Sequence, residues 1–527
     1  MFCHFVIVQK QIESTGVFMT SISEQNTHYR FIINGESCDP SNGIYDNVKN
    51  PSTGKTIAKV AMGNEVDVDR AVVAARKAFE NKEWRYMPPN KRAEILQQCA
   101  QLIAQNAQEL ALLEISCSGG TINRVAGLDI LAAVDLFMSM AETVKTFSFV
   151  ESLPATPIPE MVHTQVWKEP IGVCGLITAW NYPILLCLMK LAPALAAGNT
   201  IIIKPAEITP TSTIRLVEIL QQVLPKGVVN VIVGPGSVVG EAMSLHPDID
   251  KISFTGSTAI GKRIQQNAAH TLKRVTLELG GKGPAIVRPG VDLNFVADGA
   301  LWGVYLNAGQ VCVSGTRLIV HEDIYDELIK KLIEHSSRVV VGNPMNPTTG
   351  MGPMSTEVHF NKVIQRINDA EKEGARIVCG GKRAVVEDCE GGFFIEPTII
   401  IDVTNDMKIA REEIFGPVLS VIKYSELDEA IAIANDSNYG LSAGVWTTDL
   451  IEAQRISREL RAGSIWINDW HMARSDAPFG GFKQSGYGRE LGCYGLESYL
   501  EIKMVSTAFE RDTRKKPMHR IVHTQPL

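Results

Sequence analysis

Residues 171–280 alternate short apolar strands with helices, and this pattern restricts the fold more than any other feature of the chain. The predicted strands are IGVCGLITA, TIIIKP, GVVNVIVG, KISFTGS and RVTLELGG, and the helices between them are LLCLMKLAPALAAG, TSTIRLVEILQQVL, GSVVGEAMSLH and AIGKRIQQNAA. Strands joined by crossover helices of this length form a parallel sheet with helices on both faces. The pattern therefore predicts an α/β doubly wound sheet.

The rest of the chain divides into further regions. Residues 31–61 alternate short apolar runs with Gly, Asn and Pro, which predicts strands joined by tight turns. Residues 65–147 show apolar spacings of three and four, which predicts helices. A second α/β region runs from about 283 to 480, and a basic, polar tail begins at Ser506. Because 527 residues exceed what one hydrophobic core usually serves, we expect two or three domains.

The composition argues against several classes of function. Hydrophobic residues make up 45% of the chain and charged residues 21%, as in globular proteins, and a net charge of -7 offers no basic excess for nucleic acid. The ten cysteines include no C-x-x-C pair and no zinc-like spacing with histidine, so no metal site is indicated and a reducing, cytoplasmic compartment is expected. The longest apolar run, 171–198, contains Asn181, Pro183 and Lys190, which argues against a membrane helix.

Two glycine-containing turns are candidates for binding nucleotide phosphates. GPGSVVG, with Gly234, Gly236 and Gly240, is one residue longer than G-x-G-x-x-G and by itself is equally consistent with an ordinary strand-to-helix turn. FTGSTAIG places Ser257 at the start of a predicted helix, where backbone N–H groups can hold a pyrophosphate. Two such turns in one sheet favour a dinucleotide cofactor.

Lys204 and Glu207 follow the predicted strand TIIIKP, at the edge of the sheet where ligands bind. A carboxylate there accepts hydrogen bonds from ribose hydroxyls and repels a 2′-phosphate, which favours NAD over NADP. The alternative interpretation is a surface Lys–Glu pair of little energetic weight.

Cys312, in YLNAGQVCVSGTR, lies among small and amide residues without a second cysteine nearby. By base rate, a lone cysteine is a packing residue. A nucleophilic thiolate needs its pKa, about 8.5 in a free thiol, lowered by N–H donors or positive dipoles, and this setting suits such a thiolate. These residues alone leave both interpretations open.

Seven motifs, in order along the chain, resemble the signatures of the NAD(P)-dependent aldehyde dehydrogenase superfamily. They are ITAWNYP, IIIKPAE, FTGSTAIG, LELGGKGP, NAGQVC, EEIFGPV and PFGGFKQSGYGRELG. The resemblance covers roughly residues 30–505. It departs at Tyr305, where the family usually has Phe, and at Gly283, where Ser or Asn is commoner.

The resemblance implies an α/β fold with a Rossmann-type parallel-sheet NAD domain, an α/β catalytic domain and a small β flap for oligomerisation. The expected boundaries are 1–30 for an N-terminal arm, 31–147 and 171–280 for the NAD domain, 281–480 for the catalytic domain, 148–170 and 497–507 for the flap, and 508–527 for the tail. Because members are dimers or tetramers, a homodimer or homotetramer is expected. The Pro-punctuated stretch LPATPIPEMVHTQVWKEP suits the flap, since an edge strand invites a partner.

The resemblance also assigns catalytic roles. Cys312 matches the nucleophile, whose addition to an aldehyde gives an alkoxide that readily expels hydride. The Asn181 amide and the Cys312 backbone N–H match the oxyanion donors. Glu278 matches the base that activates water to hydrolyse the thioester, which implies a free acid as product. Lys190 and Glu490 match positions linked to proton relay, although a structural ion pair is a nearly equal alternative.

NAD and a small aldehyde are the expected ligands. Glu413 is expected to hold the nicotinamide-ribose hydroxyls and Phe415 to flank the ring; the other predicted cofactor residues are Ile177, Thr178, Trp180, Lys204, Glu207, Gly240, Phe254, Thr255, Gly256, Ser257 and Leu279. The predicted substrate residues are Tyr182, Leu186, Met189, Val311, Val313, Trp470, Arg474 and Phe479.

The chemical class of the aldehyde is left open by the sequence. Trp470 suggests an aromatic surface for a quaternary ammonium, as in betaine-aldehyde-type enzymes, but Met189 stands where many relatives have Trp. Arg474 either binds a substrate carboxylate, as for a semialdehyde, or is a solvent-exposed arginine of the loop. The second alternative is slightly favoured.

Three other functions are alternatives to the oxidation of an aldehyde to the free acid. A cysteine esterase would need a histidine base near the thiol, and no histidine lies in a catalytic motif. A non-enzymatic role would be signalled by loss of Cys312 or Glu278, and both are present. A coenzyme-A-acylating dehydrogenase typically lacks the base at Glu278.

Overall fold

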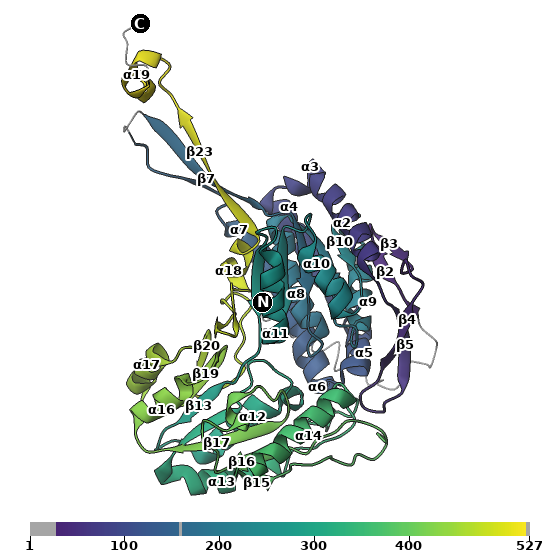
Figure 1. The fold of residues 1–527 in the computed structure, drawn as a ribbon, viewed down its shortest axis with the longest axis vertical. Helices are drawn as coiled ribbons and strands as arrows, with labels where there is room; N and C mark the ends of the chain where they lie inside the picture. Colours follow the sequence, from purple (N-terminus) through teal and green to yellow (C-terminus); the bar gives the residue numbers. More distant parts are fainter. Residues whose placement is uncertain (1–27, 157–160, 523–527) are drawn as a thin grey trace.

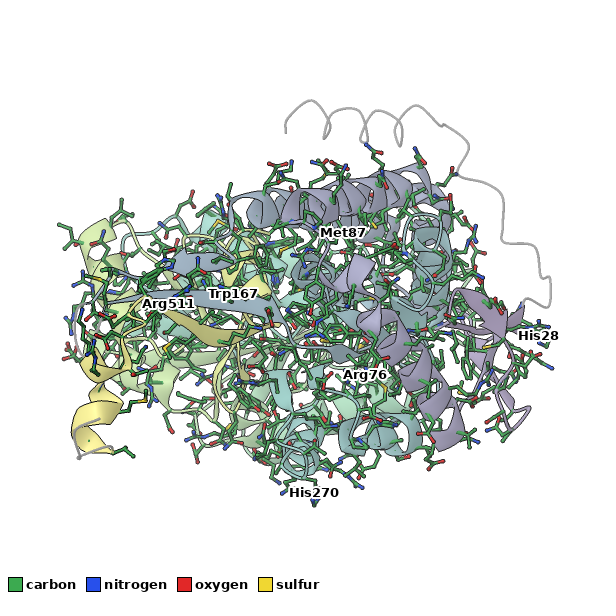
Figure 2. All side chains as sticks on the ribbon, turned by 90° about the horizontal axis from the view of Figure 1, so that it is seen from above. His28, Arg76, Met87, Trp167, His270 and Arg511 are labelled. Atoms are coloured by element: carbon green, nitrogen blue, oxygen red, sulfur yellow. The ribbon has the colours of Figure 1, made fainter. Side chains whose placement is uncertain are left out.

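The computed structural model describes residues 28–156 and 161–522, so the expected arm at 1–30 lies almost wholly outside the described residues, as does the end of the tail. Figure 1 shows two α/β bodies next to each other and a long β arm that projects from one of them. Figure 2 shows Arg511 toward one side of the molecule and His28 at the opposite side.

The first body contains an eight-stranded sheet in the order β22-β12-β11-β8-β9-β10-β2-β3. Its five central strands pair in parallel, which confirms the α/β fold class. The strands are β2 (Phe31–Ile33), β3 (Glu36–Cys38), β8 (Val173–Ile177), β9 (Thr200–Lys204), β10 (Val229–Val231), β11 (Lys251–Thr255), β12 (Arg274–Glu278) and β22 (Gly486–Tyr487). The two-residue edge strand β22 comes from the far C-terminal region and lacks any alternating pattern by which it could have been predicted.

Helices flank this sheet (Figure 1). Those within the βαβ region are α8 (Pro183–Ala197), α9 (Thr211–Leu220), α10 (Glu241–Leu245) and α11 (Thr258–Ala268). A π-helical turn, η2 (Gly236–Gly240), precedes α10, where one continuous helix was predicted. The preceding helices are α2 (Glu65–Glu80), α3 (Lys82–Arg85), α4 (Pro89–Gln105), α5 (Ala107–Ser118), α6 (Ile122–Arg124), the π-helical turn η1 (Val125–Asp129) and α7 (Ile130–Thr146).

The second body contains a seven-stranded sheet in the order β15-β16-β17-β14-β13-β19-β20, parallel except at β15. Its strands are β13 (Pro284–Val287), β14 (Arg317–His321), β15 (Arg376–Cys379), β16 (Thr398–Ile401), β17 (Val418–Tyr424), β19 (Ser442–Trp446) and β20 (Ser464–Ile467). Its helices are α12 (Leu293–Tyr305), η3 (Leu306–Gly309), α13 (Glu322–Ser336), α14 (Glu357–Lys372), α15 (Lys408–Arg411), α16 (Leu427–Asn435) and α17 (Leu450–Glu459).

The arm is a three-stranded sheet of β6 (Val150–Ser152), β7 (Val162–Pro170) and β23 (Leu500–Ala508), which follows α18 (Gly492–Glu497). The ladder between β7 and β23 is unbroken from Leu500↔Pro170 to Ala508↔Val162. The described part of the tail contains η4 (Thr513–Lys515) and α19 (Pro517–Ile521), at the tip of the arm (Figure 1). Smaller elements complete the fold: β1 (His28–Tyr29), β4 (Tyr45–Lys49), β5 (Thr56–Ala61), β18 (Tyr439–Gly440) and β21 (Phe482–Lys483).

Within the described residues, no helix is both long enough and apolar enough to cross a bilayer.

Trp470 belongs to the interior of the second body and does not line a substrate site as predicted. It is 2% exposed, and its indole N–H donates to the carbonyl of Val313 (2.8 Å). Its ring lies against glycines, because a Cβ added at Gly303, Gly315 or Gly444 would meet it at 2.4–3.0 Å. With its ring enclosed and its N–H satisfied, Trp470 offers no face to a ligand.

Trp470→Ala is expected to lower the free energy of unfolding by about 3–5 kcal/mol, the usual cost of deleting a large buried aromatic side chain. The glycines around the ring have no side chains that can move into the cavity, so relaxation is limited. The measurement is the urea midpoint followed by circular dichroism, with Trp167→Ala, a half-buried position on the arm, as control. Equal shifts for the two variants would contradict the packing role.

Candidate active site

The loop that carries Cys312 begins with three consecutive residues in the left-handed region: Asn307 (φ 52°), Ala308 (φ 53°) and Gly309 (φ 71°). A Cβ on Gly309 would lie 2.0 Å from the carbonyl oxygen of Gly416, so only glycine lets the two backbones approach. Two non-glycine residues in this region are strained and persist only where their surroundings fix them. The loop is thus held in one conformation immediately before Cys312.

Gln310 fixes this loop from inside. Its side chain is fully buried, donates to the carbonyls of Asn307 (3.0 Å) and Pro353 (3.3 Å), and accepts from the N–H of Ser355 (2.9 Å). Buried amides with all partners present hold a unique geometry, because each lost bond would leave a buried polar atom unsatisfied.

Asn181 lies at the start of α8 and is 4% exposed. Its side-chain nitrogen donates one proton to the carbonyl of Gln310 (2.9 Å), the residue two positions before Cys312. An amide nitrogen carries two protons, so the second is available to another acceptor.

The structure corrects the expectation of an acidic Cys312 thiol. Burial, together with the carboxyl groups of Glu413 and Glu278, raises the pKa of Cys312 to about 12. Backbone N–H donors oppose this shift without reversing it. The thiol is therefore neutral at rest and needs a base before it can attack.

Glu278 is the last residue of β12, paired in register with Thr255 at the end of β11. Among the described residues neither of its buried carboxyl oxygens has a hydrogen-bond partner. Burial, followed by the charge of Glu490, raises the pKa of Glu278 well above its usual range, and Lys190 and Arg489 oppose this. A carboxyl group in such a setting is a stronger base than an exposed one once it loses its proton.

Lys190 of α8 and Glu490 form a fully buried ion pair, to which Ser253 adds a hydrogen bond from its hydroxyl to Glu490 Oε1 (3.2 Å). The second oxygen of Glu490 is buried and unpartnered within the described part of the chain. The ion pair that the sequence offered as one alternative is thus present, and it acts electrostatically on Glu278.

The predicted cofactor residues gather at the carboxyl ends of parallel strands, where Ile177 of β8 pairs with Lys204 of β9. Lys204 Nζ contacts Glu207 Oε2 (3.2 Å). The hydroxyls of Thr178 and Thr255 are buried and lack a partner among the described residues. Such orphaned donors suit a polar ligand, so the residues present fit a dinucleotide.

The remaining cofactor candidates surround the start of α11. The Ser257 hydroxyl caps this helix by accepting from the N–H of Ile260 (3.4 Å). Phe254 and Leu279 are buried, their side chains lie against the Cα atoms of Gly256 and Gly261 respectively, and open space adjoins Gly240. The exposed N–H groups at this helix start have the polarity that a pyrophosphate requires.

Glu413 accepts a hydrogen bond from the N–H of Gly281 (2.9 Å), and burial raises its pKa to about 7. Phe415, with φ 58°, meets Trp180 edge to face at 5.3 Å between ring centroids. His359 completes this group: it lies 5.5 Å from the Trp180 ring, and its Nε2 contacts the Phe415 carbonyl (2.7 Å).

Most of the apolar residues predicted to contact the substrate come from α8, from the residue before it and from the Cys312 loop. Tyr182, Leu186 and Met189 are buried at the helical spacing of four and three along α8, and Val311 and Val313 flank Cys312. Phe479 is half-buried and exchanges two backbone hydrogen bonds with Glu490.

Arg474 points to solvent, with its side chain 74% exposed and paired to Asp476 (2.7 Å). This is the solvated arrangement that the sequence slightly favoured over a substrate contact.

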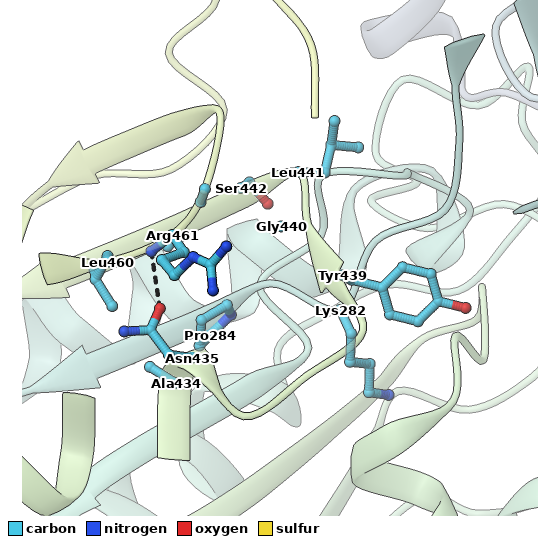
Figure 3. Close-up of a pocket in the computed structure, with 12 residues that line it drawn as sticks. Lys282, Pro284, Ala434, Asn435, Tyr439, Gly440, Leu441, Ser442, Leu460 and Arg461 are labelled. Atoms are coloured by element: carbon cyan, nitrogen blue, oxygen red, sulfur yellow. Dashed lines mark hydrogen bonds between the residues drawn. The ribbon is translucent and has the colours of Figure 1, made fainter. Parts of the chain in front are cut away.

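A separate hollow lies in the second body, lined by residues that include Pro284, Ser442 and Leu460. Figure 3 shows Lys282 and Tyr439 on one side of it and Asn435 and Arg461 on the other, where the Arg461 N–H donates to Asn435 Oδ1 (2.8 Å). Burial lowers the pKa of Lys282 to about 7. None of the predicted site residues lines this hollow.

Sequence reasoning missed three residues that shape the site: Gln310, His359 and Arg124. Gln310 stands within a recognised motif, but its amide pattern gives no sign of burial. His359 and Arg124 lie on helices far from any motif, and only the tertiary fold brings them to Phe415 and Asn181.

Comparison with known proteins identifies the family. The family model for the aldehyde dehydrogenase family matches residues 40–505. The chain is 41% identical to betaine aldehyde dehydrogenase of Bacillus subtilis over 475 residues (90% of this chain, 96% of the relative). It is 40% identical to human retinal dehydrogenase 2 over 486 residues (90% and 91%).

Solved structures of aldehyde dehydrogenases are also similar to this chain. The NAD+ complex of betaine aldehyde dehydrogenase from Staphylococcus aureus superimposes with a TM-score of 0.89 at 40% identity, covering 92% of this chain and 96% of that one. The NAD+ complex of aldehyde dehydrogenase from Bacillus cereus gives 0.88 at 39% identity (92% and 97%). The chain belongs to the aldehyde dehydrogenase family, and the predicted NAD-dependent aldehyde oxidation is confirmed.

The Tm of the Glu278→Gln variant, relative to that of the natural protein, is expected to increase as pH rises. Because the folded pKa is raised, the carboxyl contributes fully at acid pH, and the folded state loses stability as pH rises through that value. Glutamine stays neutral throughout and avoids this loss.

Scanning calorimetry from weakly acidic to alkaline pH measures the effect, with Glu94→Gln on the exposed surface of α4 as the matched control. A Tm difference that does not change with pH would rule out a raised pKa at Glu278.

Proposed function

We propose that this enzyme oxidises an aldehyde to the free carboxylic acid, with Cys312 as nucleophile and Glu278 as base. The proposal is carried by three groups: a thiol in a rigid loop, a buried amide that donates to the backbone of that loop and has a second N–H, and a buried carboxyl group, without hydrogen-bond partners among the described residues, whose charge acts on the thiol. These are the three groups that thioester-forming oxidation and hydrolysis need.

The first half of the reaction forms the thioester. Glu278, in its ionised form, takes the thiol proton, and the sulfur adds to the aldehyde carbon. The oxygen that becomes negative accepts hydrogen bonds from Asn181 Nδ2 and the Cys312 N–H. When bound, NAD supplies an acceptor for the hydride that this carbon releases. The acyl group is then left on Cys312.

The second half hydrolyses the thioester. After the proton taken from the thiol has passed to solvent, the ionised Glu278 removes a proton from water, and the hydroxide adds to the acyl carbon. The sulfur leaves as the thiolate and takes the proton from Glu278, which restores the resting thiol and carboxylate. Lys190 and Glu490 form a charged pair that acts on Glu278, which supports a part for them in returning its proton to solvent. The second candidate function is transfer of the acyl group to coenzyme A. A base at position 278 favours hydrolysis over this transfer.

Glu207 supports a preference for NAD over NADP. It pairs with Lys204 at the end of β9 and keeps its carboxylate half-exposed, where ribose hydroxyls can bond to it and a 2′-phosphate is repelled.

The substrate we propose is a medium-sized, largely apolar or mildly polar aldehyde. Tyr182, Leu186 and Met189 give the site an apolar wall. A betaine aldehyde is the alternative suggested by the names of the relatives, although the enclosed ring of Trp470 cannot contribute to an aromatic cage. The ion pair of Arg474 with Asp476 argues against a semialdehyde held by that arginine.

A homodimer or homotetramer is proposed through the arm. β23 is an edge strand of the three-stranded sheet and exposes Ile502 (68%) and Met504 (72%). An edge strand with apolar side chains is a surface on which a second copy can pair.

The two sheets support the domain division at about 280 given above. The unpaired state of every described cysteine supports a reducing, cytoplasmic compartment.

An aldehyde panel tests the reaction. Aliphatic, aromatic, carboxylated and trimethylammonium aldehydes are each supplied with NAD or NADP, and reduced cofactor is followed by absorbance. Turnover is expected with NAD, with free acid as product, and none with Cys312→Ala. Acyl-CoA formation in the presence of coenzyme A would instead favour the second candidate, and activity that survives Cys312→Ala would refute the mechanism.

A further inference from the structure

Arg124 is a buried cation next to the amide of the proposed oxyanion site, and no sequence motif includes it. It is 4% exposed, at the end of α6, and its Nη1 donates to the backbone carbonyl of Asn181 (3.1 Å). Its guanidinium lies 4.3 Å from the ring centroid of Tyr182. A Cβ on Gly120 would come within 1.9 Å of Nη2, so this glycine makes room for the guanidinium.

The π-helical turn that follows α6 places the counter-ion. Asp129, its last residue, lies 3.4 Å from Arg124 Nη2 and is fully buried. π-Helical turns inside helical segments are frequent at functional sites. Here the turn brings Asp129 to the arginine that contacts Asn181.

Glu114 of α5 holds the same segment one turn further along. Its Oε2 accepts from the N–H of Ile184 (3.0 Å) and from the Ser212 hydroxyl (3.1 Å). The start of α8 has no capping side chain of its own, so Glu114 satisfies a donor that would otherwise be orphaned. A carboxyl group from α5 and a guanidinium from α6 thus fix positions 184 and 181.

We propose that Arg124, with Asp129 as its anchor, is a positioning residue that sets the Asn181 amide for oxyanion binding. The inference rests on the role proposed for Asn181. The Asn181 carbonyl is held from two sides, by Arg124 and by Asn307 Nδ2 (3.1 Å) of the Cys312 loop. One amide proton is committed to Gln310, so the direction of the other follows from the position of this peptide unit.

Arg124 does not itself bind substrate. The Tyr182 ring covers its guanidinium, and Asp129 neutralises its charge. A substrate group would have to displace both before it could reach the remaining donors.

A double-mutant cycle tests the proposal. Arg124→Met is expected to lower kcat for aldehyde oxidation roughly 10- to 100-fold at unchanged KM, the order of loss caused by a misplacement of about 1 Å. In an Asn181→Ala background the same substitution is expected to cost nothing further, because the group it positions is gone. A merely structural effect would reduce activity equally in both backgrounds.

Arg92→Met is the matched control. Arg92 is also a buried arginine, and it donates to the carbonyl of Ala197 (2.8 Å) at the opposite end of α8. The kcat of the Arg92→Met variant, expressed per titrated Cys312 thiol, is expected to equal that of the natural enzyme. If Arg124→Met does not fold, Arg124→Lys replaces it in the cycle: it keeps the charge, changes the donor geometry and is subject to the same non-additivity test.

The outcomes separate the two proposals. Additive losses in the cycle, or a loss confined to carboxylated aldehydes, would overturn the positioning role. An Asn181→Ala variant as active as the natural enzyme would instead overturn the oxyanion site itself, whatever Arg124 does.

Discussion

The hydrogen bond from the Asn181 side chain to the Gln310 carbonyl joins the two halves of this molecule at their chemical centre. Its partners are 129 residues apart, one at the start of a helix in the first body and one in the loop that leads to Cys312 in the second. A backbone carbonyl cannot move without its peptide, and the surrounding peptides are fixed by the Gln310 side chain and by the contact of Gly309 with Gly416. The relative position of thiol and amide therefore follows from the way the two bodies pack.

The catalytic groups of the centre are buried. Burial is the largest cause of the raised pKa values at Cys312, Glu278 and Glu413, so it favours the neutral form of each group. A desolvated site strengthens each hydrogen bond made to a charge that develops during reaction. The same desolvation makes the Glu278 carboxylate a stronger base than an exposed carboxylate would be.

Most of the fold was readable from the sequence, because strand–helix alternation repeats over a hundred residues and leaves one plausible sheet. Motif residues such as Cys312, Asn181 and Glu278 could be named because their motifs resemble those of the family. Glu278 ends β12 and Asn181 lies between β8 and α8, whereas Cys312 lies in the loop between η3 and β14. Trp470 was misjudged because the pattern around an aromatic residue does not reveal that its neighbours in space are glycines. The thiol pKa was misjudged because it depends first on burial in the tertiary fold and then on the carboxyl groups of Glu413 and Glu278, which are distant in sequence from Cys312.

Residues that only orient others escaped notice altogether, and there is a physical reason for this. Arg124, Asp129 and Glu114 are charged residues on helices, and such residues are ordinarily solvated. Their burial becomes evident only when α8 is packed over them, since their partners are backbone groups at Asn181 and Ile184 that carry no side-chain signature. Arg124 and Glu114 contact the backbone at and just before the start of α8, so they fix the segment that carries the Asn181 amide. An arginine next to the sulfur would lower its pKa, but it would also compete with Asn181 for the developing oxyanion. The arrangement thus separates the task of holding the geometry from the task of stabilising charge.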